Sequence, residues 1–312
     1  MSIPRIGASF QAPSSKAMLE TIQRAEKLGV KGVWLTTGGG PDALTVFAAA
    51  AVTTSSIFMG TSIVPTFPRH PIVMAQQAAD IAQLAPGRFA LGIGPSHQNG
   101  MEGRLGIPYE RPIEHLREYL TVLKRVLATG EVDFSGRRFD IHARLVYGAD
   151  IPVVISALRA RSFELAGELA DGAVTWICPA PYIRDVALPA LERGARAAGR
   201  PRPLLIAHAF ICLTEDRATM LEVAGTATAG YPRQPNYAAM FTAAGFPEAQ
   251  QGVWSDTMRD SVVLHGDESR AKERVQEFLA TSGADHLILS VLPAGQDRQS
   301  SMDRSLRFVA SL

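Results

Sequence analysis

The 312-residue sequence contains few cysteines and almost no net charge. Its two cysteines, Cys178 and Cys212, are isolated in apolar surroundings, a pattern that indicates neither a disulfide framework nor a zinc site. Lysine and arginine total 31 against 30 acidic residues, so general electrostatics give no reason to bind nucleic acid or a membrane surface. We therefore expect a protein of the reducing cytoplasm that acts on a small molecule.

Long apolar segments are also missing. The longest run, at 43–51, is interrupted by Thr45 and is too short to span a bilayer. The N-terminal residues contain no long apolar core and no small-residue cleavage site, so we expect no signal peptide. The 46% hydrophobic content, with 27 glycines and 20 prolines, instead indicates a folded protein of many short elements joined by tight turns.

Short apolar runs alternate with amphipathic helical segments along the chain. Helices are predicted at 16–28, 113–127, 162–170 and 269–280, and glycines stop three of them, at Gly29, Gly130 and Gly283. Eight near-continuous apolar runs are typical of parallel strands buried on both faces: 5–10, 32–36, 57–64, 89–94, 153–157, 172–178, 204–213 and 285–292. Eight strands that alternate with helices predict an α/β fold, a single (β/α)₈ TIM-barrel domain over residues 1–312.

Two segments interrupt the alternation. Residues 131–151 predict a small hairpin that turns at Ser135–Gly136. Residues 214–264 contain further helix-forming sequence rich in alanine, tyrosine and proline. Because insertions after barrel strands belong to the C-terminal face, we place both segments there. The second segment is our candidate for a wall or lid of the active site.

The residues that follow the predicted strands lack the groups that hydrolytic enzymes use. There are no paired acids for glycoside hydrolysis, no HExxH motif or other metal-ligand cluster, and no GxSxG motif, so we expect no metal site. The remaining lining consists of small, apolar and hydroxyl residues with an aromatic ring, Trp176, and an imidazole, His97. Such a lining suits a flat, largely apolar cofactor ring.

Three segments together resemble a known family. They are GTSIVPTFPRHP at 60–71, GRFALGIGPSH at 87–97 and AGELADGAVTW at 166–176. They are similar to segments of the luciferase-like monooxygenase superfamily, and most of all to its actinobacterial branch of oxidoreductases that use the deazaflavin coenzyme F420. The resemblance implies a TIM barrel, a homodimer, and hydride transfer between coenzyme F420 and a small organic substrate.

The resemblance also implies roles for individual residues. A non-prolyl cis peptide is expected between Ser62 and Ile63, where it supports the middle ring of the deazaflavin. Gly94 and Ser96, at the end of the fourth strand, are expected to face the cofactor. His97 follows them and is the candidate proton donor or acceptor, because imidazole titrates in the right range. The alternative for His97 is a hydrogen bond to the cofactor or a local capping role.

The turn expected to bind the cofactor phosphate departs from the family pattern. Relatives have a glycine-rich turn after the fifth strand, whereas residues 156–161 contain no glycine. The resemblance then assigns the backbone N–H groups of Ala157 and Leu158 to the phosphate, with positive charge from Arg159 or Arg161.

Trp176, at the end of the sixth strand, is expected beside the ring or substrate, with packing in the core as its alternative. Two other functions remain open at this stage. One is an FMN-dependent monooxygenase of the same superfamily. The other, of a different class, is a non-catalytic protein that binds flavin or deazaflavin.

Overall fold

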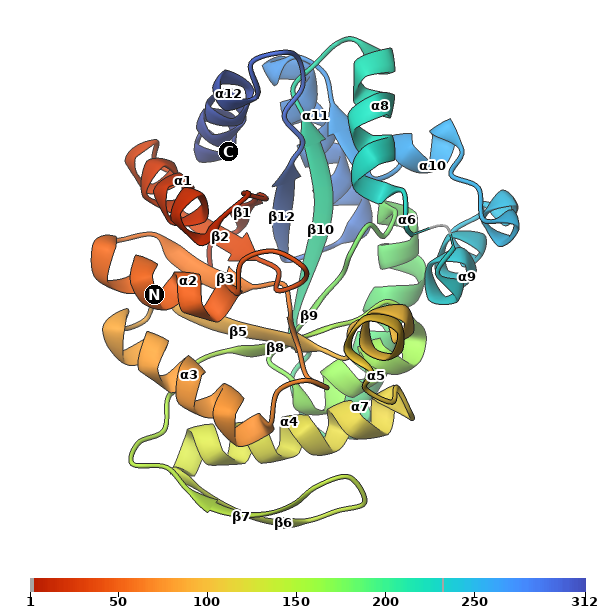
Figure 1. The fold of residues 1–312 in the computed structure, drawn as a ribbon. Helices are drawn as coiled ribbons and strands as arrows, with labels where there is room; N and C mark the ends of the chain where they lie inside the picture. Colours follow the sequence, from red (N-terminus) through yellow and green to blue (C-terminus); the bar gives the residue numbers. More distant parts are fainter. Residues whose placement is uncertain (1–2, 232) are drawn as a thin grey trace.

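The barrel expected from the sequence is present. In the computed structural model, which describes residues 3–231 and 233–312, eight parallel strands close into a barrel with helices around it (Figure 1). These strands are β1 (Ile6–Ser9), β2 (Gly32–Leu35), β3 (Phe58–Thr61), β5 (Phe89–Gly94), β8 (Val153–Ser156), β9 (Gly172–Val174), β10 (Leu204–Cys212) and β12 (His286–Val291). They pair in chain order, and β12 pairs with both β10 and β1, which closes the ring.

One end of the barrel interior is filled by side chains that the strands contribute. Trp34 is the largest of them, and it packs with Phe58, Ala90, Val154, Val174, Ile206 and Ile288. Gly7 and Gly60 provide the space for Trp34, because a Cβ atom would lie 2.8 Å and 2.4 Å, respectively, from the indole. This layer is a solid core, so a ligand has to bind beyond it.

The predicted helices are confirmed. The helices packed around the strands are α1 (Ser15–Lys27), α2 (Ala43–Thr53), α3 (Pro71–Leu84), α4 (Pro112–Thr129), α5 (Ala160–Leu169), α7 (Leu188–Ala197), α11 (Glu268–Ser282) and α12 (Arg298–Ala310). Gly130 and Gly283 end α4 and α11 in the left-handed conformation, at φ values of 74° and 66°. No helix in the described ranges has the length and apolar character needed to cross a membrane.

Two predicted strands differ from the structure by more than their end residues. The 57–64 run divides into β3 and β4 (Val64–Pro65), and the peptide bond between Ser62 and Ile63 is cis. The 172–178 run ends at Val174, because only the start of β10 pairs with β9. Farther along the same side of β10, a strand that we did not predict, β11 (Val263–His265), takes the place of β9.

The two insertions lie in different places. The hairpin, β6 (Glu131–Ser135) and β7 (Asp140–Arg144), follows a helix and packs along the outside of α4 (Figure 1). The Glu118 carboxylate of α4 accepts N–H bonds of 2.8–3.1 Å from residues 137–139 at the hairpin turn. Our placement of this insertion at the C-terminal face is therefore wrong, because the chain leaving α4 returns toward the start of β8.

The 214–264 insertion does reach the C-terminal face. It contains α8 (Arg217–Thr228), α9 (Pro235–Ala243), a short 3₁₀ helix (Pro247–Gln251), α10 (Asp256–Asp260) and β11. Four of its residues line the cavity described below: Tyr231, Asn236, Tyr237 and Ala243. The insertion therefore forms one wall of that cavity.

Candidate active site

A cavity of about 720 Å³ lies at the C-terminal ends of the barrel strands. Its wall contains residues that directly follow β2, β5, β8 and β9, the positions where barrel enzymes bind their substrates. Nine of the predicted site residues line it: Ser62, Ile63, Ser96, His97, Ala157, Leu158, Arg159, Arg161 and Trp176. The sequence-based selection therefore converges on one cavity.

Gly94 is the predicted residue that does not line the cavity. A Cβ atom at this position would lie 2.0 Å from Ser156 Oγ and 3.3 Å from Ile63 Cδ1. A larger residue at this position would displace these two side chains, which do line the cavity. Gly94 therefore packs against the cavity wall without lining it.

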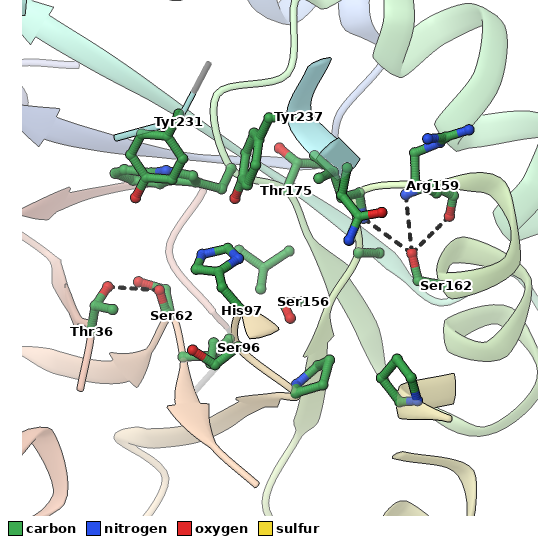
Figure 2. Close-up of a pocket in the computed structure, with 18 of the residues that line it drawn as sticks. Thr36, Ser62, Ser96, His97, Ser156, Arg159, Ser162, Thr175, Tyr231 and Tyr237 are labelled. Carbon is green, nitrogen blue, oxygen red and sulfur yellow. Dashed lines mark hydrogen bonds between the residues drawn. The ribbon is translucent and has the colours of Figure 1, made fainter. Parts of the chain in front are cut away.

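The cis-linked pair at the floor is held by the loop that follows β2. The Thr36 hydroxyl donates to the Ser62 carbonyl oxygen at 2.7 Å, and the Thr37 N–H donates to the Ile63 carbonyl oxygen at 3.0 Å (Figure 2). Both carbonyl oxygens therefore accept a hydrogen bond from within the protein. The pair thus has a fixed position at the cavity edge.

His97 lies inside the cavity beneath two tyrosines of the insertion (Figure 2). Its ring centroid is 5.6 Å from that of Tyr237 and 6.2 Å from that of Tyr231. Burial lowers the pKa of His97 below its ordinary value of 6.5. The imidazole is therefore neutral at pH 7 and able to accept a proton.

The backbone around His97 is fixed on both sides. Ser96 has a φ of 62°, in the left-handed region, and its carbonyl oxygen accepts a 3.0 Å bond from the Tyr109 hydroxyl. The His97 carbonyl oxygen accepts bonds of 3.0 Å from Gly100 and Met101 N–H groups at the start of a π-helical segment, Asn99–Arg104. These bonds fix the backbone from which the His97 side chain enters the cavity.

Aromatic residues form the wall opposite the floor. The Tyr231 ring centroid lies 6.0 Å from that of Trp176 and 4.8 Å from that of Tyr237. Burial raises the pKa of both tyrosines above 10, so they stay protonated and act as hydrogen-bond donors. Our sequence reasoning did not single out these two residues, and its only signal was the tyrosine-rich composition of 214–264.

Trp176 lies between the cavity and the core. It lines the cavity, and the other side of its ring contacts the core, with a centroid 4.4 Å from that of His208. His208 is buried beneath the cavity, where its Nε2 lies 2.7 Å from Ser290 Oγ, and burial lowers its pKa to about 3. His208 is therefore a neutral structural residue.

The start of α5 forms the positive end of the cavity. The Ala157 N–H donates to the Val174 carbonyl oxygen at 3.0 Å, and the Leu158 N–H donates to Ser162 Oγ at 3.1 Å. The expectation that these two N–H groups are free for a phosphate is therefore wrong, because the strand ladder and the Ser162 cap already use them. Arg159 N–H also donates to Ser162 Oγ, at 3.2 Å (Figure 2).

The backbone N–H groups available to an anion belong to the next residues of the chain, at the start of α5. The N–H groups of Ala160 and Arg161 begin α5, where a helix has no intrahelical acceptors for them. Arg159 and Arg161 line the cavity. Both acids of α5 are engaged elsewhere, since Glu164 pairs with Arg193 at 2.9 Å and Glu168 with Arg117 at 2.5 Å. This end thus carries positive charge that the helix itself does not neutralise.

The described lining contains no aspartate or glutamate. Within residues 3–231 and 233–312, no group of three or more His, Cys, Asp or Glu side chains is arranged to hold a metal ion. The volume lies within the range of cofactor and substrate pockets. An apolar floor, an aromatic wall and a positive end together fit a planar ring with an anionic tail.

Comparison with known proteins agrees with this geometry. The 5,10-methylenetetrahydromethanopterin reductase of Methanolobus tindarius is 26% identical over 277 residues, 82% of this chain and 84% of the reductase. The F420-dependent glucose-6-phosphate dehydrogenase of Microbacterium testaceum is 31% identical over 222 residues, 65% of this chain and 66% of the dehydrogenase. The 5,10-methylenetetrahydromethanopterin reductase of Methanopyrus kandleri is 29% identical over 191 residues, and the chain spans 54% of that reductase.

Two solved structures share the fold. An F420-dependent secondary alcohol dehydrogenase, solved with an F420–acetone adduct, has a TM-score of 0.81 at 20% identity over 97% of both chains. The oxygenating constituent of 3,6-diketocamphane monooxygenase from Pseudomonas putida, solved with FMN, has a TM-score of 0.74 at 15% identity over 98% of this chain and 97% of that one. A family model described as luciferase-like monooxygenase matches residues 3–286. The chain belongs to the luciferase-like monooxygenase family.

Proposed function

We propose that this protein is an oxidoreductase that transfers a hydride between coenzyme F420 and a small organic substrate. The observation that carries the proposal is that one cavity is lined by His97, by the Ser62–Ile63 pair and by the positive start of α5. The relatives named as F420-dependent support the choice of cofactor. When bound, the deazaflavin supplies two-electron hydride chemistry.

The residues of the cavity divide into cofactor and substrate groups. Ser62 and Ile63 would hold the ring, with Gly94 packed close to Ile63. The N–H groups of Ala160 and Arg161, with the guanidinium groups of Arg159 and Arg161, would hold the phosphate.

The substrate would bind between His97 and the aromatic wall. There the neutral imidazole takes up the proton that leaves a substrate hydroxyl, or returns it in the opposite direction. Trp176 and the tyrosines of the insertion exclude water from this position.

The positive end of the cavity gives the first test. We expect R159Q and R161Q each to weaken deazaflavin binding about tenfold, because each removes a charge-assisted hydrogen bond to the phosphate. A spectral titration of the purified protein measures the dissociation constant. R193Q is the matched control, since Arg193 pairs with Glu164 through a bond on the α5–α7 side.

The same titration separates the alternatives. Tighter binding of FMN than of the deazaflavin, together with oxygen consumption, would identify a flavin monooxygenase. A bound deazaflavin that stays inert toward alcohols, enones, imines and chemical hydride donors would identify a binding protein. If both arginine variants bind the deazaflavin as tightly as the wild type, the phosphate does not bind at the start of α5.

We also propose that the protein forms a homodimer through α2 and α3. These neighbouring helices carry large apolar side chains that are exposed in the single chain, Val52 (64%), Val73 (45%) and Leu84 (47%). Such residues are favourable in a subunit interface. Sedimentation equilibrium is expected to give twice the 33.5 kDa chain mass at micromolar concentration, and a monomer there would contradict the proposal.

A further inference from the structure

The insertion places a phenol hydroxyl in the cavity, and the residues that the structure describes give it no hydrogen-bond partner. Tyr237, in the first turn of α9, is 4% exposed, yet its hydroxyl forms no hydrogen bond with the described residues. Figure 2 shows this hydroxyl directed toward His97. Because Tyr237 lines the cavity, its hydroxyl is placed to donate a hydrogen bond to an acceptor atom of a ligand.

The neighbouring tyrosines differ from Tyr237 either in the bonding of the hydroxyl or in burial. Tyr109 donates its hydroxyl proton to the Ser96 carbonyl oxygen at 3.0 Å, which leaves it no proton to donate to a ligand. Tyr231 is only partly buried, and its ring packs against Trp176, with centroids 6.0 Å apart. Tyr237 is therefore the buried phenol beside His97 that has a proton available for a substrate.

The chemistry of the lining defines the substrate atom that fits. No carboxylate lines the described cavity, and the two arginines lie at the α5 end. Near His97 the groups are a neutral imidazole, which accepts a proton, and the Tyr237 hydroxyl, which donates one. The oxygen of an alcohol can form a hydrogen bond with each group. Its O–H donates to the imidazole, and its lone pair accepts from the Tyr237 hydroxyl.

We propose that Tyr237 is a catalytic residue that positions the oxygen atom of the substrate against His97. This inference rests on the proposed function. In the oxidation of a secondary alcohol, the carbon–hydrogen bond breaks and its electron pair leaves with the hydride to the deazaflavin. The oxygen–hydrogen bond breaks and its proton passes to His97, while the carbonyl double bond forms. Tyr237 donates its hydrogen bond to this oxygen throughout, and ketone reduction runs in reverse.

A matched pair of ligands isolates this hydrogen bond. Cyclohexanone carries a carbonyl oxygen, and methylenecyclohexane has a similar shape with a CH₂ group in its place. On the deazaflavin-loaded enzyme, we expect Y237F to weaken cyclohexanone binding about tenfold while methylenecyclohexane binding stays within about twofold. The surface variant Y147F is the control, and it is expected to retain the cyclohexanone affinity of the wild type.

Infrared difference spectroscopy provides a signature that a purely structural role would not change. A donated hydrogen bond lowers the carbonyl stretching frequency of bound cyclohexanone, and we expect Y237F to abolish most of that shift while thermal melting remains unchanged. The role of Tyr237 would be overturned if Y237F and the wild type showed equal cyclohexanone affinity and an equal shift of the carbonyl frequency. It would also be overturned if the wild type showed no frequency shift. The dissociation constant of the deazaflavin is measured first. If the wild type does not bind the deazaflavin, the proposed function fails, and this result is distinct from a failure of the role of Tyr237.

Discussion

Replacing His97 with alanine is expected to lower kcat about 100-fold or more while the dissociation constant of the deazaflavin stays within about threefold. The physical reason is that the imidazole lies inside the cavity and supplies its proton acceptor, whereas the cofactor groups are held elsewhere. Stopped-flow turnover and a cofactor titration on the same preparation measure the two quantities. A large loss of cofactor affinity with little loss of turnover would assign His97 a binding role instead.

The pH profile sharpens this expectation. Because burial lowers the pKa of His97, the imidazole is neutral at pH 7 and accepts the proton of an alcohol substrate. For substrate oxidation, kcat/KM should be level at neutral pH and fall as the pH drops through the His97 pKa, below 6.5. This inflection should vanish in H97A. The matched control is H142A, because His142 lies on the outer hairpin, paired with Asp133 at 2.6 Å.

Replacing Gly92 with alanine is expected to lower the free energy of unfolding by about 3 kcal/mol, the upper end for an overpacked core. A Cβ atom at this position would lie 1.8 Å from the Thr61 carbonyl oxygen, so the backbones of β5 and β3 would have to separate. That separation would also strain the 2.7 Å bonds between Thr61 Oγ1 and the Gly92 N–H and carbonyl groups. Urea denaturation measures the loss.

Gly225 offers the control for this substitution. It lies in α8, and a Cβ atom there would meet no atom within 4 Å. G225A should therefore leave stability unchanged or raise it by up to about 1 kcal/mol, because alanine is the better helix former. If G92A is as stable as G225A, the close approach of β5 and β3 does not constrain the fold. A folded G92A should still lose activity, since β5 leads directly into Ser96 and His97.

Several features of the barrel follow from local sequence. The 89–94 run coincides with β5, because a strand buried on both faces must be apolar at every position. The glycines at 130 and 283 mark the ends of α4 and α11, because a left-handed residue closes a helix most easily without a Cβ atom. These patterns depend only on near neighbours, so a single sequence reveals them.

The site could be predicted only in part. The residues after β3, β5 and β8 were found, because strand ends in a parallel barrel share one face. The fate of the Ala157 and Leu158 N–H groups could not be predicted, since it depends on Val174 from a neighbouring strand and on the rotamer of Ser162. The three-residue strand β11 was missed because so short a run has no periodicity of its own.

The sequence by itself thus determined the eight parallel strands of the barrel and the residues at their C-terminal ends. Only the tertiary structure decided that the hairpin packs outside α4 and that Tyr237, 140 residues beyond His97 in the chain, faces the imidazole across the cavity. The physical reason is the range of the interactions. Burial and backbone conformation are encoded by adjacent residues, whereas the convergence of an inserted segment on a strand end depends on how the whole barrel packs.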